Sequence, residues 1–452
     1  MLDSSYLLPF DLFQQLVIWL GTSMQTYRNG RRFLETNQVL LRAEIERELE
    51  RLISAHAEEK VEMKQQMQHH QELLRAVRER GGSSTAIREA YINVYGGFAL
   101  DLPEWLEAIE KQKAQLQRLR RPERTTRAQL HLLREAMRQA LADPEIAQEI
   151  VAELSNESGN TLLQGPLLLS YAEQRRILEE AIACYTSAMN VYSYTHYPLQ
   201  YARTCMYLGA AYQRYGILLN AQEAIEKALT YYQSALWIYN RKEHPEQWSL
   251  LQTLMGKTYA ARRVGGIQNN LDYAAFCHEA ALLGLQQEEY PEVWARAQAN
   301  LGDVYLLRQQ RGYPANLAKA LICYQGALRV YTQQAFPKEW ADMHAKLATV
   351  FQKMASQDEQ QSDTLQSCSI VCCEVALKVY TADAYAVEYA TTQFCLGKTH
   401  AMRIADRRDG HLEQAIKCYR EALHIFTSER FPAEHQQVSM HVVEAKAAGE
   451  SK

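Results

Sequence analysis

The chain has 452 residues, of which 47% are hydrophobic and 23% charged, and its formal net charge is −4. This length exceeds what one small core can organise, so we expect several domains or one extended array. The near-neutral balance excludes a general electrostatic preference for nucleic acid or for anionic membranes.

The first apolar stretch covers residues 6–20 and reads YLLPFDLFQQLVIWL. It contains Asp11, no basic segment precedes it, and no small-residue cleavage site follows it. These features do not fit a signal peptide or a membrane span. They predict a core helix of a cytoplasmic protein.

Residues 36–80 contain neither glycine nor proline and end at the pair Gly81-Gly82, which predicts one long helix. Its apolar residues form a narrow stripe, which is typical of a coiled-coil-like helix that needs a partner. The predicted helices 104–120 and 125–141 could supply that partner within the chain. A second copy in a homodimer is the alternative.

Two short segments here could carry function. The stretch RLRRPERTTR is a candidate basic patch for a phosphate or an acidic partner, although a solvated helix corner explains it as well; its arginines are Arg118, Arg120, Arg121, Arg124 and Arg127. It is the one feature that favours nucleic acid, which we do not expect as a partner. The adjacent His69 and His70 point about 100° apart on a helix, so we expect no metal site there.

The segment SNESGNTLLQGP, residues 155–166, is rich in serine, asparagine and glycine and is predicted to be a linker. The chain is therefore expected to have an N-terminal helical domain over 1–154 and a different architecture over 167–452.

The second part is an internal repeat with spacings of 46 to 49 residues. Its anchors are Pro198, Pro245, Pro291, Pro337, Ala386 and Pro432. A small residue follows eleven positions later in the first five copies: Gly209, Gly256, Gly302, Ala348 and Gly397. An alanine precedes every anchor by ten positions: Ala188, Ala235, Ala281, Ala327, Ala376 and Ala422. Proline suits a helix start, and small residues suit the close approach of two helices.

Five of the nine cysteines share one repeat position, fourteen residues before an anchor: Cys184, Cys277, Cys323, Cys372 and Cys418. A small polarizable residue packs well on the buried side of a helix, so the cluster SCSIVCC (367–373) is predicted to be packing. A metal or redox site is the less favoured alternative. Copies of one position lie too far apart for disulfides, and free thiols suit a reducing cytoplasm.

The segments LGAAY, LGDVY and LGKTH, followed by AIACYTSAM, ALICYQGAL and AIKCYREAL, resemble the tetratricopeptide repeat (TPR). The resemblance implies an all-α, right-handed superhelix of about five to six units, preceded here by the N-terminal helical domain. The long period and the P-x-x-W start look like the bacterial repeats associated with caspase-like (CHAT) peptidases. No such peptidase domain is recognisable in this chain.

In that family the first helix of each unit lines a concave groove. Carried over by position, the groove would contain Arg203, Met206, Gln213, Lys257, Arg296, Asp303, Thr349, Phe394 and Lys398. Its mildly basic character would favour an acidic peptide or a C-terminal carboxylate.

No phosphate-binding loop, zinc-protease motif, nucleophile elbow or dinucleotide fingerprint occurs, so we expect no catalysis, cofactor or metal. The sequence favours a non-catalytic adaptor or scaffold in a bacterial signalling or defence system, whose partner is a protein or peptide such as a separately encoded peptidase. Two alternatives remain: an inhibitor cleaved by a partner peptidase within the linker, and a peptide-sensing regulator.

Overall fold

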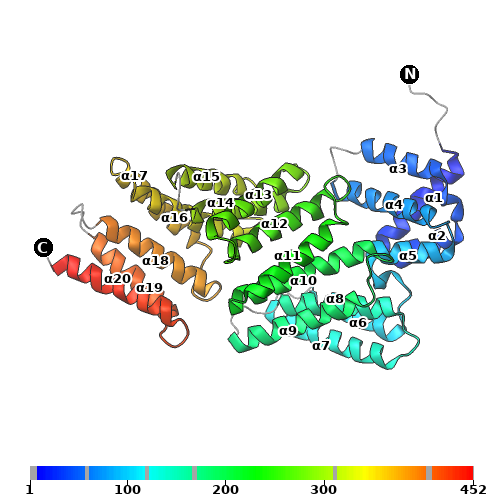
Figure 1. Cartoon of the computed structure of the whole chain (residues 1–452), viewed down its shortest axis with the longest axis horizontal. Coiled ribbons are helices and arrows are strands. Elements are labelled where there is room, and N and C mark those ends of the chain that lie inside the picture. The colour runs from blue at the N-terminus through cyan, green and yellow to red at the C-terminus, as the bar shows by residue number, and fades with distance from the viewer. Residues whose placement is uncertain are drawn as a thin grey trace, which may run out of the picture. The chain divides into compact units, whose positions relative to one another are not determined.

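The computed structural model describes residues 8–55, 61–117, 122–164, 171–308, 313–403 and 410–450. In these ranges the chain is helical throughout, without strands, and it forms two compact units, Met1–His244 and Pro245–Lys452 (Figure 1). None of the helices in the described ranges combines the length and apolar content needed to cross a bilayer.

The first unit contains eleven α-helices and two short 3₁₀ segments, counted over the described residues. They are α1 (Phe10–Gln25), α2 (Tyr27–Thr36), η2 (Gln38–Leu41), α3 (Ala43–Ala55), α4 (Val61–Glu79), α5 (Ser84–Tyr95), η3 (Gly97–Ala99), α6 (Glu104–Gln117), α7 (Pro122–Ala142), α8 (Gln148–Leu163), α9 (Tyr171–Met189), α10 (Pro198–Leu219) and α11 (Gln222–Leu236).

The second unit contains nine α-helices in its described residues. They are α12 (Pro245–Ala261), α13 (Ile267–Gly284), α14 (Pro291–Leu307), α15 (Tyr313–Ala327), α16 (Pro337–Ala355), α17 (Ser362–Ala376), α18 (Ala386–Met402), α19 (His411–Ile425) and α20 (Pro432–Glu450).

From α8 onward the helices pack as consecutive antiparallel pairs, which makes this an all-α helical-repeat solenoid of TPR-like hairpins. We call the first member of each pair an A helix (α8, α10, α12, α14, α16, α18) and the second a B helix (α9, α11, α13, α15, α17, α19). Five of the predicted anchors begin the A helices from α10 to α18, and the sixth, Pro432, begins α20. The prediction of helix starts is confirmed.

A contact between small and aromatic residues holds each hairpin together. In five of the six hairpins an A-helix glycine lies against a B-helix ring so closely that an added Cβ would approach the ring to 2.4–2.6 Å. The pairs are Gly159–Tyr185, Gly209–Tyr232, Gly256–His278, Gly302–Tyr324 and Gly397–Tyr419. Each of these rings is fully buried, as are the six repeated alanines. The predicted role of the small residues is therefore confirmed.

A second ring contact marks the junctions between one hairpin and the next. An aromatic residue six positions before an anchor meets a ring one position before it, edge to face, with centroids 5.3–5.9 Å apart. The pairs are Tyr192–Tyr197, Tyr239–His244, Tyr331–Phe336, Tyr380–Tyr385 and Phe426–Phe431. This regularity was not predicted, although its spacing is visible in the repeats.

The predicted linker is wrong over residues 155–163. They belong to α8, where Ser155, Asn156 and Ser158 are buried and Gly159 receives the Tyr185 ring. The physical reason is that a buried A helix needs small residues, which composition alone does not distinguish from a loop. The repeat therefore begins one hairpin earlier than expected, since Gly159 follows Gln148 by the same eleven positions that separate Gly209 from Pro198. The remaining linker residues 165 and 166 lie outside the described residues.

The predicted long helix over 36–80 is also wrong. Residues 38–41 form a 3₁₀ turn, and α3 and α4 pack against each other as an antiparallel pair (Figure 1). Glu46 near the start of α3 forms ion pairs with Arg75 and Arg78 near the end of α4, which one straight helix would keep far apart.

The apolar stripe of this segment is satisfied within the chain. Ile45, Leu49, Leu74 and Val77 are buried in a core shared with α1, α2 and α5. The helices over 104–117 and 122–142 were predicted to cover this stripe, but they pack with α8 in a separate core. The predicted intrachain packing is correct, and its predicted partners are wrong.

The glycine–ring contact predicts a large effect of one methyl group. We expect Gly302→Ala to destabilise the protein by about 1–3 kcal/mol, because a Cβ there would lie 2.6 Å from the Tyr324 ring. Gly326→Ala in α15 is the matched control, since its nearest neighbour would be the flexible Gln298 side chain at 3.4 Å. Urea unfolding of both variants measures the difference, and equal stabilities would contradict the packing account.

His278 predicts a dependence of stability on pH. It occupies the ring position of the α12–α13 hairpin with neither ring nitrogen hydrogen-bonded, and burial, with Lys257 adding to it, lowers its pKa to about 3. The folded state therefore holds it neutral while the unfolded state protonates near pH 6.5. Stability from this group is present above pH 6.5 and is lost as the pH falls toward 3, by about 1.4 kcal/mol per pH unit.

We expect His278→Phe to remove that loss. Chemical unfolding near pH 7 and near pH 5 would show the variant gaining about 2 kcal/mol on the native protein over the interval. A pH dependence identical in both proteins would rule out the assigned role of this ring.

Candidate functional site: the A-helix face of the second unit

The predicted groove residues of the second unit lie on A helices that are adjacent in space. Helix α12 contacts α14, and α16 contacts α18, so their side chains can form one surface. Lys257 lies on α12, Arg296 and Asp303 on α14, and Lys398 on α18. We call this surface the A-helix face.

Asp303 is the acidic centre of this face. Its Oδ2 atom lies 2.7 Å from Nζ of Lys346, and its Oδ1 accepts a 2.8 Å hydrogen bond from the buried Tyr324 hydroxyl. The Lys346 amine also lies 5.7 Å from the centre of the Tyr324 ring. One carboxylate is thus occupied by a cation and by the ring that holds the hairpin together.

Two further cations, Lys257 and Arg296, lie near this centre, and Arg296 also interacts electrostatically with the Glu246 carboxylate. Within the described part of the chain, neither Lys257 nor Arg296 has a carboxylate within ion-pair distance. Burial lowers the pKa of Lys257. The positive charges of Lys346 and Arg296 lower it further, and the negative charge of Asp303 only partly opposes these effects. Among its charged neighbours, two cations therefore oppose the charged form of Lys257 and one acid favours it. An anion would relieve that imbalance.

Lys398 continues the positive face onto α18. Its amine lies 4.9 Å from the centre of the Phe394 ring, an attractive cation–π arrangement. Phe394 itself is buried against Tyr419 and His441, so it supports the face from below and is not available to a ligand. Thr349 is half-buried on α16, where its hydroxyl donates to the carbonyl of Ala345 at 3.2 Å.

The sequence reasoning missed Lys346. It lies one position past a groove position of the family pattern, so the carry-over by position passed over it. The only signal in the sequence was a lysine next to the predicted face, which does not distinguish it from an ordinary surface lysine.

The three remaining predicted groove residues lie in the first unit and serve packing there. Arg203 donates through Nη2 to both carboxylate oxygens of Glu153, at 2.8 and 2.7 Å. Gln213 is buried and Met206 is half-buried. Because Arg203 is already paired, it offers less to a ligand than Lys257 does.

Glu153 belongs to a buried network that joins the N-terminal helices to the first hairpins. The Tyr192 hydroxyl lies 2.9 Å from Glu153 Oε2 and accepts a 3.0 Å hydrogen bond from the Gly97 amide. A Cβ on Gly97 would lie 1.9 Å from the Glu149 carbonyl oxygen, so only glycine fits there. Asn93 accepts the Leu199 amide at 2.9 Å, which caps the start of α10.

The candidate basic patch falls largely outside what the structure describes. Arg118, Arg120 and Arg121 lie outside the described residues, as does the side chain of Arg124. Arg127 is exposed on α7. Its role stays a prediction.

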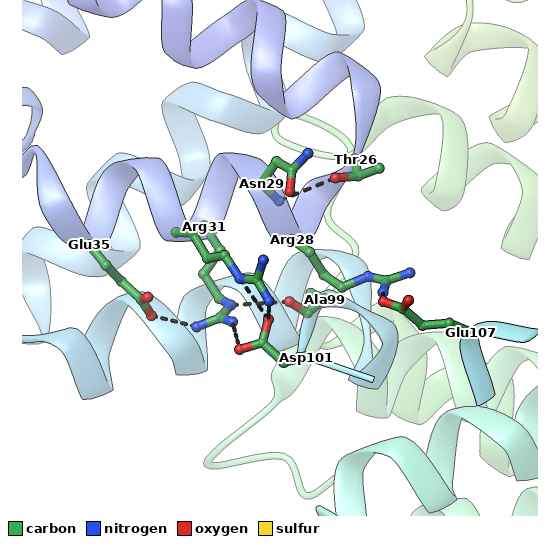
Figure 2. A network of polar contacts seen from close by, with 9 residues as sticks. Thr26, Arg28, Asn29, Arg31, Glu35, Ala99, Asp101 and Glu107 are labelled. Carbon is green, nitrogen blue, oxygen red and sulfur yellow. Dashed lines mark hydrogen bonds and ion pairs between the residues drawn. The ribbon is translucent and has the colours of Figure 1, made fainter. Parts of the chain in front are cut away.

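A second polar cluster lies in the first unit, where α2 meets the segment 99–107 (Figure 2). The buried guanidinium of Arg31 contacts Glu35 at 2.6 Å, Asp101 at 2.8 Å and the Ala99 carbonyl at 3.2 Å. Arg28 pairs with Glu107 at 2.7 Å. Burial opposes ionisation of Asp101, but Arg31 and Arg32 outweigh it and lower its pKa.

A cleft of about 470 Å³ borders this cluster, lined by Arg31, Arg88, Asp101, Asp143 and Glu145 together with several apolar side chains. Arg31 and Asp101 neutralise each other, and Arg88 lies 3.8 Å from Glu149. The cluster therefore holds α2 against the segment 99–107.

No family model matches this sequence, and no curated protein matches it either. Solved structures that align with the chain include yeast Tom70, at 12% identity over 97% of this chain and 96% of that one, with a TM-score of 0.41. A circular tandem repeat protein aligns at 13% identity over 98% and 97%, with a TM-score of 0.21. At these scores the alignments carry no argument, and the fold assignment rests on the hairpins described above.

The pairing of Arg203 predicts a structural role. We expect Arg203→Met to destabilise the protein by about 2–4 kcal/mol, because it leaves the Glu153 carboxylate, 14% exposed, without its cation. Arg176→Met, an exposed arginine of the same unit, should change stability by less than about 0.5 kcal/mol. Thermal unfolding of the two variants compares them, and an Arg203 variant as stable as its control would contradict this role.

Proposed function

We propose that this chain is a non-catalytic protein-interaction scaffold whose A-helix face in the second unit binds an acidic peptide segment or a C-terminal carboxylate. The observation that carries the proposal is that, within the described residues, neither Lys257 nor Arg296 has an ion-pair partner, while the nearby Asp303 is already paired with Lys346. Lys257, Arg296 and Lys398 present their charges from three A helices, and the acid among them, Asp303, is held by Lys346 and Tyr324.

The chemistry of such a face suits a carboxylate. Lysine amines and arginine guanidiniums form charge-assisted hydrogen bonds to carboxylates, which are stronger than neutral ones. Extended peptides have several acidic groups that can meet cations spaced along neighbouring helices. A ligand carboxylate beside Lys257 would also favour the protonated amine, whose pKa the free protein holds down.

The finer proposal follows the resemblance of the repeats. We propose a cytoplasmic adaptor of a bacterial signalling or defence system, with a separately encoded peptidase or other effector as partner. The alternative of an inhibitor cleaved in the 155–166 segment is less favoured, because residues 155–163 lie in a largely buried helix. A homodimer through the α3–α4 stripe is less favoured too, because that stripe is buried within the chain.

The binding face is tested with a short fluorescein-labelled polyglutamate peptide that has a free C-terminus. Fluorescence anisotropy should show saturable binding that weakens with added salt. The double variant Lys257→Ser/Arg296→Ser should weaken binding about 25-fold, since each lost ion pair at these exposed positions contributes about 1 kcal/mol, or fivefold.

The matched control is Arg329→Ser/Lys378→Ser, which removes the same charge from exposed positions just beyond the B helices α15 and α17 of the same unit. We expect it to bind almost as the native protein does. Equal weakening in both double variants would reduce the effect to net charge, and absence of binding by the native protein would refute an acidic ligand. The same peptide with an amidated C-terminus is measured for comparison. Weaker binding of the amidated peptide would show that the terminal carboxylate contributes, and equal binding would assign the interaction to the side-chain carboxylates.

The scaffold role itself is tested by affinity purification of the full chain from its native cells, followed by mass spectrometry. A stoichiometric protein partner supports the proposal, and a peptidase among the partners supports its finer form. Recovery of the chain alone would contradict a constitutive scaffold.

A further inference from the structure

The position one past the A-helix glycine has the same structural task in two hairpins. In the α8–α9 hairpin, Asn160 Oδ1 accepts a 2.8 Å hydrogen bond from the hydroxyl of Tyr185. In the α14–α15 hairpin, Asp303 Oδ1 accepts a hydrogen bond of the same length from Tyr324. Both tyrosine rings are fully buried. A neutral amide oxygen can therefore satisfy the ring hydroxyl, so closing the hairpin does not require the charge of Asp303.

The second carboxylate oxygen of Asp303 shows where that charge acts. Oδ2 lies 2.7 Å from Nζ of Lys346, which belongs to the next A helix, α16. An asparagine side chain has one oxygen and no net charge, so it could accept from Tyr324 but could not form this ion pair. The charge of Asp303 is therefore directed at Lys346.

This ion pair lies at the surface of the A-helix face. The side chain of Asp303 is 38% exposed and that of Lys346 is 33% exposed, so a ligand can reach both groups. An ion pair open to solvent contributes little to stability. Its larger effect is on the charge that the face presents, because Asp303 neutralises Lys346 and repels other carboxylates that approach.

Asp303 also lies among the cations assigned to the ligand. Asp303 and Lys346 are both charged neighbours of Lys257, and the three residues come from the A helices α14, α16 and α12. Within the described residues, Lys257 and Arg296 have no ion pair that a ligand would have to break. Lys346 does have one, and the group that holds it is a carboxylate, the same group that an acidic peptide offers.

We propose that Asp303 is a built-in competitor for acidic ligands, whose carboxylate occupies Lys346 as a ligand carboxylate would. This inference rests on the proposed function of the A-helix face and adds the residue that sets its affinity. A ligand acid that pairs with Lys346 exchanges one ion pair for another and gains little by it. The native face therefore binds acidic peptides through Lys257 and Arg296, and removing the charge of Asp303 adds Lys346 to the site.

The test is Asp303→Asn in the full-length protein, measured with the fluorescein-labelled polyglutamate peptide by fluorescence anisotropy. The variant should bind about fivefold more tightly than the native protein, which is the factor that one exposed ion pair contributes. Asparagine keeps an oxygen for the Tyr324 hydroxyl, as Asn160 does for Tyr185, so the variant should fold. Circular dichroism and the urea midpoint check this.

Two controls separate competition from a change in net charge. Glu374→Gln removes the same charge from an exposed position of the B helix α17 and should leave binding almost unchanged. The double variant Asp303→Asn/Lys346→Gln has the net charge of the native protein and should return to about the native affinity. An equal gain in Glu374→Gln would assign the effect to net charge. A gain that persists in the double variant would exclude Lys346 as the place of competition.

The outcomes distinguish this inference from the proposed function. If the native protein binds the peptide and Asp303→Asn binds it no more tightly, the competitor role is overturned and the acidic-ligand face stands. If neither protein binds, the acidic ligand is refuted and the competitor role fails with it. Binding by Asp303→Asn alone would support the competitor role. If Asp303→Asn does not fold, Asp303→Ser removes the same charge and provides the same test.

Discussion

The structure depends on one recurring contact, in which a glycine of an A helix lies against a ring of the B helix. Removing the side chain on one helix lets the ring of the other approach the backbone, which closes the hairpin at a fixed separation and crossing. Each ring is buried by this contact, and its hydroxyl, where hydrogen-bonded, meets an A-helix residue one position past the glycine, as Tyr185 meets Asn160 and Tyr324 meets Asp303. The packing contact therefore also positions a polar group at the edge of the A-helix face.

The same contact is followed along the chain by a position whose charge varies from one hairpin to the next. The position one past the glycine holds the acid Asp303 in one hairpin and the cations Lys257 and Lys398 in two others. Asp303 receives a tyrosine hydroxyl, whereas Lys257 stands beside His278, which burial keeps neutral. The residue at this position does not affect the glycine–ring packing. Its variation therefore changes the sign of the surface charge from one hairpin to the next.

Thiol, titratable and polar groups occur where a hairpin departs from the repeat pattern. In the α16–α17 hairpin, Ala348 and Cys373 replace the glycine and the ring, and Cys373 packs in one apolar cluster with Cys395. In the α12–α13 hairpin, His278 places a titratable group at the ring position. In the first unit the exception is a junction. There the Tyr192 hydroxyl contacts groups outside the repeats: it accepts a hydrogen bond from the Gly97 amide and donates one to Glu153. These bonds join the N-terminal helices to the first hairpins.

The sequence by itself determined the helical class, the start of each A helix from α10 onward, and the burial of the repeated alanines, because these follow from local chemistry repeated at a constant spacing. Proline marks a helix start and an alternation of small and aromatic residues marks close packing wherever they occur. The sequence also predicted most cations of the A-helix face, since Lys257, Arg296 and Lys398 occupy predicted groove positions of the repeat.

Only the tertiary structure decided where that pattern begins and which groups meet. The segment 155–163 has the composition of a loop and is a buried helix, because its small polar residues receive the Tyr185 ring and bond within the core. The antiparallel packing of α3 on α4 and the choice of partners for their stripe depend on residues far apart in the chain, such as Glu46 and Arg75. The packing of Cys373 and Cys395 in one apolar cluster is of the same kind, because the two positions become neighbours only when consecutive hairpins pack.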